Sequence, residues 1–266
     1  MFILDIFKYQ IFEMKNNNLN LENSPLSNMV YNSVLKNKFE VKDAEQGLRN
    51  LKLFRHHWPC KSWDTYKMIK IISNFDRESF VLDVGCYESP ILPMLKRLGF
   101  INLYGCDLIL KPDLKSNFVS SGYHADYKPI AEMYRDNSYK LSIQNLEDTT
   151  YSNRMFDYIT SLSVIEHGVN IEKYFMEMSR ILKSKGYLLT STDYWPEKIF
   201  NGKNVLSSGP PDNIFSREEI ENVIGVAEKN GFRLIEPIDF EYEDKVVHWN
   251  ELGLDYTFIF FAMRKE

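Results

Sequence analysis

The chain has 266 residues, of which 44% are hydrophobic, and its formal net charge is -5. A chain of this length buries one large core, so we expect a single α/β domain with a short N-terminal extension. The negative charge argues against binding to nucleic-acid phosphates, which requires a basic face. We therefore expect a small or neutral substrate and no nucleic-acid partner.

Three cysteines occur, at positions 60, 86 and 106, and their spacing fits no metal site. An odd count gives no disulfide framework and suits a reducing compartment, which indicates a cytoplasmic protein. We interpret all three as buried or half-buried thiols, and we expect no metal ligands.

The first 27 residues read as an apolar segment followed by a linker. Asp5, Lys8 and Glu13 interrupt the apolar residues 1–14, which are shorter than the roughly 20 residues needed to span a bilayer. We expect neither a signal peptide nor an integral membrane segment. An amphipathic helix that docks on the domain, or on a second subunit in a homodimer, is favoured over a membrane-surface anchor. The Asn-rich residues 15–27 predict a polar linker.

The folded part begins after this linker with a mostly helical pattern over 28–75, which predicts a helical cap beside a sheet. Its candidate buried residues are Trp58, Trp63, Tyr66, Ile69 and Ile72.

The periodicity then changes. Residues 80–84 form a short apolar run, typical of a strand buried on both faces of a parallel sheet. A helical apolar spacing follows Ser89 and stops at Gly99. A second strand over 102–106 leads to Asp107, so the unit is strand, loop, helix, strand and acid.

A second unit of the same kind follows. Strands are predicted over 139–146 and 156–164. The next helix ends at Lys185 and Gly186 and leads into a strand over 187–191. Its apolar stripe consists of Ile171, Tyr174, Phe175, Met178, Ile181 and Leu182.

The C-terminal part predicts one more helix and two strands. A capping box of Ser216 and Glu219 opens the helix and Gly231 closes it. Strands are expected over 233–238 and 256–263. This alternation predicts a doubly wound, mostly parallel, seven-stranded sheet with helices on both faces.

In such a sheet, ligands bind beyond the carboxyl ends of the strands. The loop after the strand at 80–84 contains Asp83 and Gly85, and Asp107 follows 24 residues after Asp83. That spacing is near the one at which an acid binds a ribose diol, and it indicates an adenosine-type ligand. The alternative is that Gly85 serves only a tight turn and that Asp107 is a solvated strand end.

Several segments together resemble, in order and spacing, the motifs of class I S-adenosylmethionine-dependent methyltransferases. They are Val81-Leu-Asp-Val-Gly-Cys86, Tyr104-Gly-Cys-Asp107, Asn145-Leu-Glu-Asp148, the run from Phe156 to His167, and Glu177-Met-Ser-Arg-Ile-Leu-Lys-Ser-Lys-Gly-Tyr187. The resemblance covers about residues 63–266, and it implies a methyltransferase domain over 28–266 with S-adenosylmethionine as cofactor.

The resemblance also implies where the cofactor binds. Asp83 and the backbone around Gly85 would hold its amino-acid end, and Asp107 would accept hydrogen bonds from the ribose. Asn145 stands where the family often has an Asp facing adenine, a mild change because its carbonyl accepts a hydrogen bond from the adenine amine. The full set of implied contacts is Asp83, Gly85, Cys86, Tyr87, Asp107, Leu108, Asn145, Leu146, Ser161 and Leu162.

The resemblance places Glu166 and His167 at the site of methyl transfer. His167 is the best candidate for a general base, because an unperturbed imidazole titrates near neutrality. The alternative is that it only orders the cofactor loop. Further residues lie in segments that could overhang the cleft: His124, Asp193, Tyr194, Trp195, His248 and Trp249.

One departure from the family puts cofactor binding in question. Tyr87 and Ser89 stand where the family usually has glycines, which permit positive φ and close backbone approach. Ser89 could instead cap the next helix with Pro90 at its first position. A methyltransferase-fold scaffold without activity is therefore an alternative.

The segment after 156–164 lacks the Asn or Asp, two prolines and an aromatic that typify methylation of amino groups in nucleobases and glutamine. We therefore expect O-methylation of a small molecule or a saccharide, with a protein or nitrogen acceptor as the alternative. A Rossmann dehydrogenase is disfavoured because the loop lacks Gly-x-Gly-x-x-Gly. Residues 196–215 are long enough to form a lid, although a static loop is equally compatible.

Overall fold

The computed structural model describes residues 31–87, 89–108, 110, 136–199, 213–250 and 253–266. The chain divides into two units, 1–30 and 31–266, and the fold described here is that of the second. Our predictions for residues 1–27, for His124 and for the middle of the 196–215 loop lie outside the described residues.

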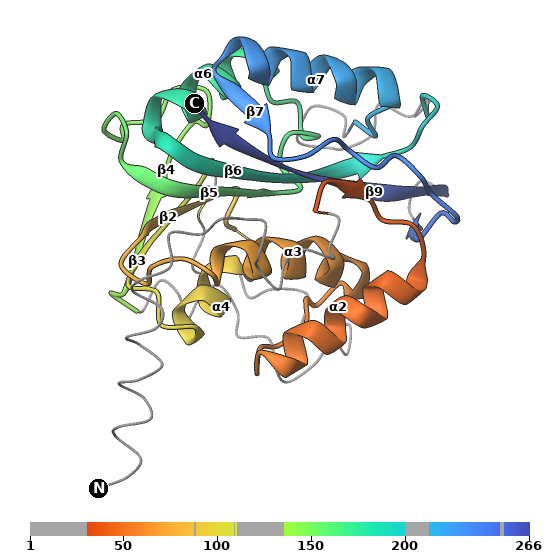
Figure 1. Ribbon diagram of the computed structural model, residues 1–266, viewed down its shortest axis with the longest axis horizontal. Helices are drawn as coiled ribbons and strands as arrows, with labels where there is room; N and C mark the ends of the chain where they lie inside the picture. Colours follow the sequence, from red (N-terminus) through yellow and green to blue (C-terminus); the bar gives the residue numbers. More distant parts are fainter. Residues whose placement is uncertain (1–30, 88, 109, 111–135, 200–212, 251–252) are drawn as a thin grey trace, which may run out of the picture. The chain divides into compact units, whose positions relative to one another are not determined.

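Among the described residues, seven strands form one continuous path in the order β1-β9-β6-β5-β2-β3-β4 (Figure 1). Their bounds are β1 Ser33–Val34, β2 Phe80–Val84, β3 Asn102–Asp107, β4 Tyr139–Ile143, β5 Phe156–Leu162, β6 Leu182–Tyr194 and β9 Leu254–Lys265. The strands from β6 to β4 along this path are parallel, and β9 runs antiparallel to β6. Two short strands, β7 Phe232–Leu234 and β8 Val247–Trp249, also pair with β9. The predicted doubly wound, mostly parallel sheet is confirmed.

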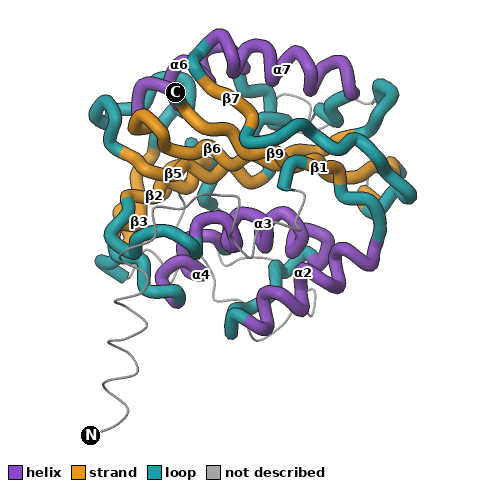
Figure 2. Tube along the Cα trace, in the orientation of Figure 1, coloured by secondary structure: helices purple, strands orange, loops and turns teal. Residues whose placement is uncertain are grey.

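Helices cover both faces of this sheet (Figures 1 and 2). One face carries α2 Lys38–Asn50, α3 Ser62–Ile72 and α4 Ile91–Arg97, and the other carries α6 Ile171–Ile181 and α7 Arg217–Lys229. A short 3-10 helix, η2 Pro59–Lys61, precedes α3. The predicted helical cap is thus part of a layer on the sheet, because α3 packs against β5 and beside α4.

The core lies on both sides of the central strands. In β9 every residue from Tyr256 to Met263 is buried, as expected for a strand covered on both faces. Most of the expected helical core positions are also buried, including Trp63, Ile69 and Ile72. The prediction that Trp58 is buried was wrong. This side chain is 42% exposed, because it belongs to the loop before η2 and not to a packed helix. Tyr66 is half-buried.

Several predicted boundaries were wrong. Strand β5 stops at Leu162 instead of 164, and β6 Leu182–Tyr194 and β9 Leu254–Lys265 are longer than predicted. Helix α6 ends at Ile181, not at Lys185, because Leu182 already pairs with Phe156 across a register irregularity. Strand β4 stops at Ile143 instead of reaching 146, and β7 stops at Leu234 instead of 238. In each case tertiary pairing, which the local apolar pattern does not contain, sets the end of the element.

Candidate active site

Strands β2, β3, β5 and β6 run parallel, so their carboxyl ends meet at one edge of the sheet. A cleft of about 440 Å³ opens at this edge. Its lining residues are His56, His57, Trp58, Lys61, Gly85, Tyr87, Ser89, Asp107, Leu108, Leu146, Leu162, Ser163, Val164, His167 and Val169. The cleft therefore has one wall of strand-end loops and a second wall formed by the loop before α3.

The turn after β2 depends on Gly85. Its φ is +68°, and a Cβ atom built there would lie 2.4 Å from the Cγ2 atom of Val164. The backbone N–H groups of Gly85 and Cys86 both donate to the carbonyl oxygen of Cys106, at 2.8 and 3.1 Å. Only glycine fits this conformation and this gap, so the loop turns tightly at the floor of the cleft.

Tyr87 and Ser89, which replace the glycines usual in the family, are not among the residues with positive φ. The backbone conformation at these two positions therefore does not require glycine. Tyr87 lines the cleft, and the hydroxyl of Ser89 accepts a hydrogen bond from the N–H of Ile91 at 3.3 Å. Pro90 stands at the N-cap of α4, one position earlier than we predicted.

Asp107 lies at the end of β3, where its Oδ2 atom accepts the backbone N–H of Tyr87 at 3.2 Å. This bond holds the carboxylate at the mouth of the cleft beside the loop that follows β2. Apolar side chains lie in the same lining, with Leu146 and Leu162 buried and Leu108 exposed. A carboxylate next to apolar side chains fits a ribose diol beside an adenine ring.

Asp83 lies below the cleft and is not part of its lining. It is 1% exposed, and its Oδ1 atom accepts a hydrogen bond from the Thr160 hydroxyl at 2.6 Å. Burial raises the pKa of the Asp83 carboxyl to about 7, hydrogen bonds from Ser89 and Thr160 oppose the shift, and the Asp107 charge adds to it. Asp83 thus supports the loop through Ser89 instead of facing the cleft directly.

Three other implied contacts also lie outside the lining. Cys86 and Ser161 are fully buried, and Asn145 is exposed, with its side-chain oxygen accepting the N–H of Glu147 at 3.0 Å. Leu146, the neighbour of Asn145, is the residue of that turn that reaches the cleft.

A buried cluster of charged groups lies at the ends of β5 and β6. Lys61 contacts the hydroxyl of Ser163, and its Nζ atom lies 3.6 Å from Asp64 Oδ2. Asp64 in turn accepts a hydrogen bond from Ser191 at 2.9 Å. Burial alone would lower the pKa of Lys61, but the charges of Asp64, Asp193 and Glu166 raise it. The amine is therefore a stable cation at the wall of the cleft.

Glu166 and Asp193 form the acidic side of this cluster. Glu166 is 1% exposed and accepts a hydrogen bond from Thr192 at 2.9 Å, and its Oε1 atom has no hydrogen-bond partner among the described residues. Burial and then the Glu166 charge raise the pKa of Asp193, and the charges of Lys61 and His167 oppose that shift. Three carboxylates share one lysine, so the cluster can retain a proton near neutral pH.

His167 lines the cleft and is exposed, as a residue that contacts a ligand should be. Of the residues expected to overhang the cleft, the five that the structure describes do not line it: Asp193, Tyr194, Trp195, His248 and Trp249. Tyr194 is fully buried, Trp195 packs on Tyr242 with their ring centroids 4.8 Å apart, and His248 of β8 pairs with Asp255 of β9 at 2.6 Å. Trp249 also belongs to β8.

Sequence reasoning missed the second wall. His56 and His57 stack at 4.3 Å, and burial, followed by the charges of His57 and Lys61, lowers the pKa of His56 well below its usual value. The available signal was the run His56-His57-Trp58, in which polar rings interrupt a helical pattern. Ser163, which is held at φ +52°, was also missed.

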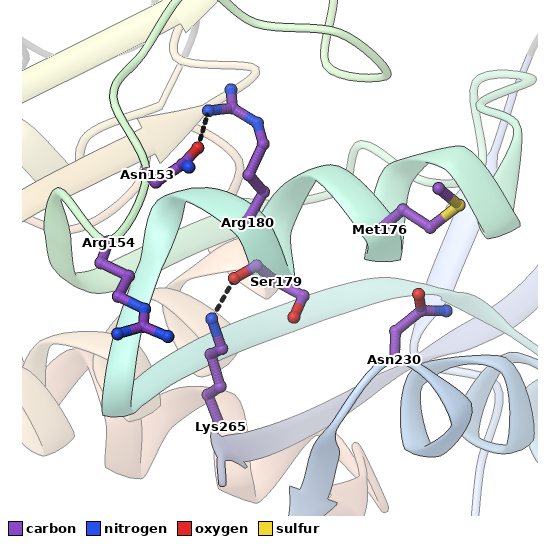
Figure 3. Close-up of a pocket in the computed structure, with 7 residues that line it drawn as sticks. All are labelled: Asn153, Arg154, Met176, Ser179, Arg180, Asn230 and Lys265. Carbon is purple, nitrogen blue, oxygen red and sulfur yellow. Dashed lines mark hydrogen bonds between the residues drawn. The ribbon is translucent and has the colours of Figure 1, made fainter.

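A second hollow lies at the amino ends of the parallel strands, between α6 and the end of β9 (Figure 3). Two of its three cations have clear partners, since Lys265 donates to the carbonyl of Leu182 at 2.9 Å and Arg180 pairs with Glu177 at 2.6 Å; the third cation is Arg154. These contacts tie the end of α6 to the sheet, so we assign this hollow a structural role.

The fold and the cleft define a class of protein: a class I S-adenosylmethionine-dependent methyltransferase fold with its ligand cleft at the carboxyl edge. A family model described as "Methyltransferase domain" matches residues 61–236. The chain belongs to this methyltransferase family, and S-adenosylmethionine is its cofactor. The Gly85 turn, the Asp107 carboxylate and the apolar lining fit that cofactor.

Two curated relatives show the extent of the sequence similarity. A ubiquinone biosynthesis O-methyltransferase from Dictyostelium discoideum is 30% identical over 118 residues, which is 42% of this chain and 34% of the relative. One from Bartonella quintana is 22% identical over 195 residues, covering 69% of this chain and 72% of the relative. The matches to the first three relatives span between 34% and 49% of their lengths.

Solved structures share the fold. The YcgJ protein from Bacillus subtilis has a TM-score of 0.52 at 17% identity, covering 76% of this chain and 98% of that one. An S-adenosylmethionine-dependent methyltransferase from Mesorhizobium loti has a TM-score of 0.50 at 12% identity, covering 76% and 98%. Within the described residues, no helix is both long and apolar enough to cross a bilayer.

Proposed function

We propose that the protein transfers a methyl group from S-adenosylmethionine to a hydroxyl of a small molecule or a saccharide. The observation on which this rests is the cleft at the carboxyl edge, where the strand-end loops with Gly85, Asp107 and His167 form one wall and the loop with Lys61 forms the other. The names of the curated relatives, ubiquinone biosynthesis O-methyltransferases, support an oxygen acceptor. We also propose that the protein acts in the cytoplasm and that it forms a homodimer.

The cofactor, when bound, supplies an electrophilic methyl group. Asp107 would accept hydrogen bonds from its ribose hydroxyls, while Leu146 and Leu162 pack on the adenine. Asp83 would act indirectly by holding Ser89 and the loop below the amino-acid end. In this proposal Cys86, Asn145 and Ser161 shape the surrounding backbone and core, since they do not line the cleft.

The protein's own contribution to the chemistry is to orient the acceptor and accept its proton. Positioning gives most of the rate in such a transfer, and a base is needed when the acceptor is a hydroxyl. His167, exposed in the cleft, would take the proton. Glu166 and Asp193 lie in the buried cluster nearby, where the His167 charge acts to lower the pKa of Asp193. Lys61 would stabilise the developing negative charge on the acceptor oxygen.

Calorimetric titration of the protein with S-adenosylhomocysteine, alongside Asp107→Ala, tests the proposal. The native protein should bind saturably, and the variant should bind about 10- to 100-fold more weakly, because hydrogen bonds to a charged group are worth about 1.5–3 kcal/mol. Asp43→Ala, which removes an exposed carboxylate from α2, is the matched control and should bind like the native protein. If the native protein does not bind, the scaffold without activity becomes the better interpretation.

An acceptor screen then distinguishes oxygen from nitrogen and protein acceptors. Hydroxyl-bearing small molecules and saccharides should consume S-adenosylmethionine, and His167→Ala should lower kcat while leaving S-adenosylhomocysteine affinity within twofold. Methylation of amines or protein side chains alone would replace the O-methyltransferase proposal.

A further inference from the structure

A groove of about 480 Å³ lies next to the cofactor cleft, on the other side of the loop before α3. Helix α2 forms one side, the 55–60 loop forms the floor, and Val246, Val247 and His248 form the other side. The function proposed above assigns no role to this groove.

Trp58 stands between the groove and the cofactor cleft. This indole lines both hollows and is 42% exposed, which is unusual for a tryptophan in a packed domain. Lys61 and His57 stand on the cleft side of the same loop, and Pro59 and Cys60 stand on the groove side. A ligand that stacks on Trp58 therefore contacts a residue that belongs to both linings.

The lining of the groove combines apolar and basic side chains. Val41, Pro59 and Val247 provide the apolar contacts. Lys38 and Lys42, one turn apart on α2, are exposed and have no acidic partner within 4 Å among the described residues.

A third cation, Arg55, lies 3.3 Å from Glu45, the one acidic side chain in the lining. Glu45 also pairs with Arg49 at 3.8 Å, so a single carboxylate serves two arginines. The groove is thus locally positive on a chain with a net charge of -5. Such local charge attracts anions against the field of the whole molecule.

We propose that this groove binds the anionic part of the methyl acceptor, a carboxylate or phosphate attached to a ring that stacks on Trp58. The acceptor's hydroxyl then lies in the cleft beside Lys61 and His167. This inference rests on the proposed function and adds to it the acceptor class: an anionic hydroxyl compound.

The first test measures the fluorescence of two probes on the full chain: 8-anilinonaphthalene-1-sulfonate and its uncharged analogue N-phenyl-1-naphthylamine. The double variant Lys38→Glu/Lys42→Glu should weaken binding of the anionic probe about tenfold and binding of the neutral probe less than twofold. The reason is that exposed charge pairs contribute up to about 1 kcal/mol each. The control, Lys185→Glu/Lys229→Glu, makes the same charge change at exposed residues outside the groove lining and should leave both probes unchanged. Trp58→Ala should weaken both probes.

The second test displaces the bound sulfonate with benzoate, phenyl phosphate and phenol. The better of the two anions identifies the charged group, and phenol should compete at least tenfold less well. Any of three results overturns the proposal. These are displacement by phenol equal to that by the anions, no displacement by either anion, and an equal loss of binding of both probes in Lys38→Glu/Lys42→Glu. Calorimetry with S-adenosylhomocysteine reports separately on the proposed function, since its failure would leave the probe results unchanged.

Discussion

At the scale of the residue, Gly85 is the position with the least freedom in the cleft. We predict that Gly85→Ala destabilises the fold by about 1–2 kcal/mol from the left-handed backbone alone, with a further cost from the 2.4 Å approach to Val164. Denaturant unfolding and S-adenosylhomocysteine affinity should both show the loss.

Two further variants separate these causes. Gly99 has a φ of +90°, and nothing lies within 4 Å of a Cβ atom built there. Gly99→Ala should therefore show only the cost of the left-handed backbone. Adding Val164→Ala to Gly85→Ala should restore part of the affinity. If Gly85→Ala costs no more than Gly99→Ala, the contact with Val164 is not important.

Asp83 makes stability depend on pH. Its folded pKa is about 7, against about 3.9 for an unfolded aspartate. The folded state therefore holds more protons between these values, and stability should fall as pH rises from about 4 to 7. In Asp83→Asn this decline should be smaller, although Asp193, whose pKa is also raised, will keep part of it. An unchanged slope of unfolding free energy against pH would contradict the assignment.

At the scale of the element, α7 shows how local sequence determines a helix start. The Ser216 hydroxyl accepts the N–H of Glu219 at 3.3 Å, and the Glu219 carboxylate accepts the N–H of Ser216 at 2.7 Å. Ser216→Ala should therefore cost about 1 kcal/mol of unfolding free energy. Ser184→Ala, an exposed serine of β6, is the control and should change stability by less than half as much. Equal effects would mean that packing alone holds the helix.

The ends of other elements were not predictable in this way. The apolar stripe of α6 continues through Leu182, but this residue is in β6 because it pairs with Phe156. Apolar periodicity does not distinguish a buried helix position from the first residue of a buried strand. The capping box, by contrast, is complete within four residues, and the predicted start of α7 was confirmed.

At the scale of the whole molecule, ligand binding should stabilise the fold. A ligand at 100 times its Kd adds about 2.7 kcal/mol, which for a domain of this size raises Tm by about 5–10 °C. We expect this shift with S-adenosylhomocysteine, measured by thermal unfolding, and a much smaller one in Asp107→Ala at the same ligand concentration. The same shift in both proteins would place the ligand away from Asp107.

The sequence by itself determined the alternation of strands and helices, the glycine turn after β2 and the acid at the end of β3. These features depend on neighbours within a few residues or on a regular period, so they can be read from the chain. Tertiary structure alone decided that Lys61, Glu166 and Asp193 share one buried cluster and that the 56–61 loop forms the second wall of the cleft. Lys61 and Ser163 are 102 positions apart and meet only when α3 packs on the sheet. Contacts of this kind follow from the packing of whole elements, which no local pattern of residues specifies.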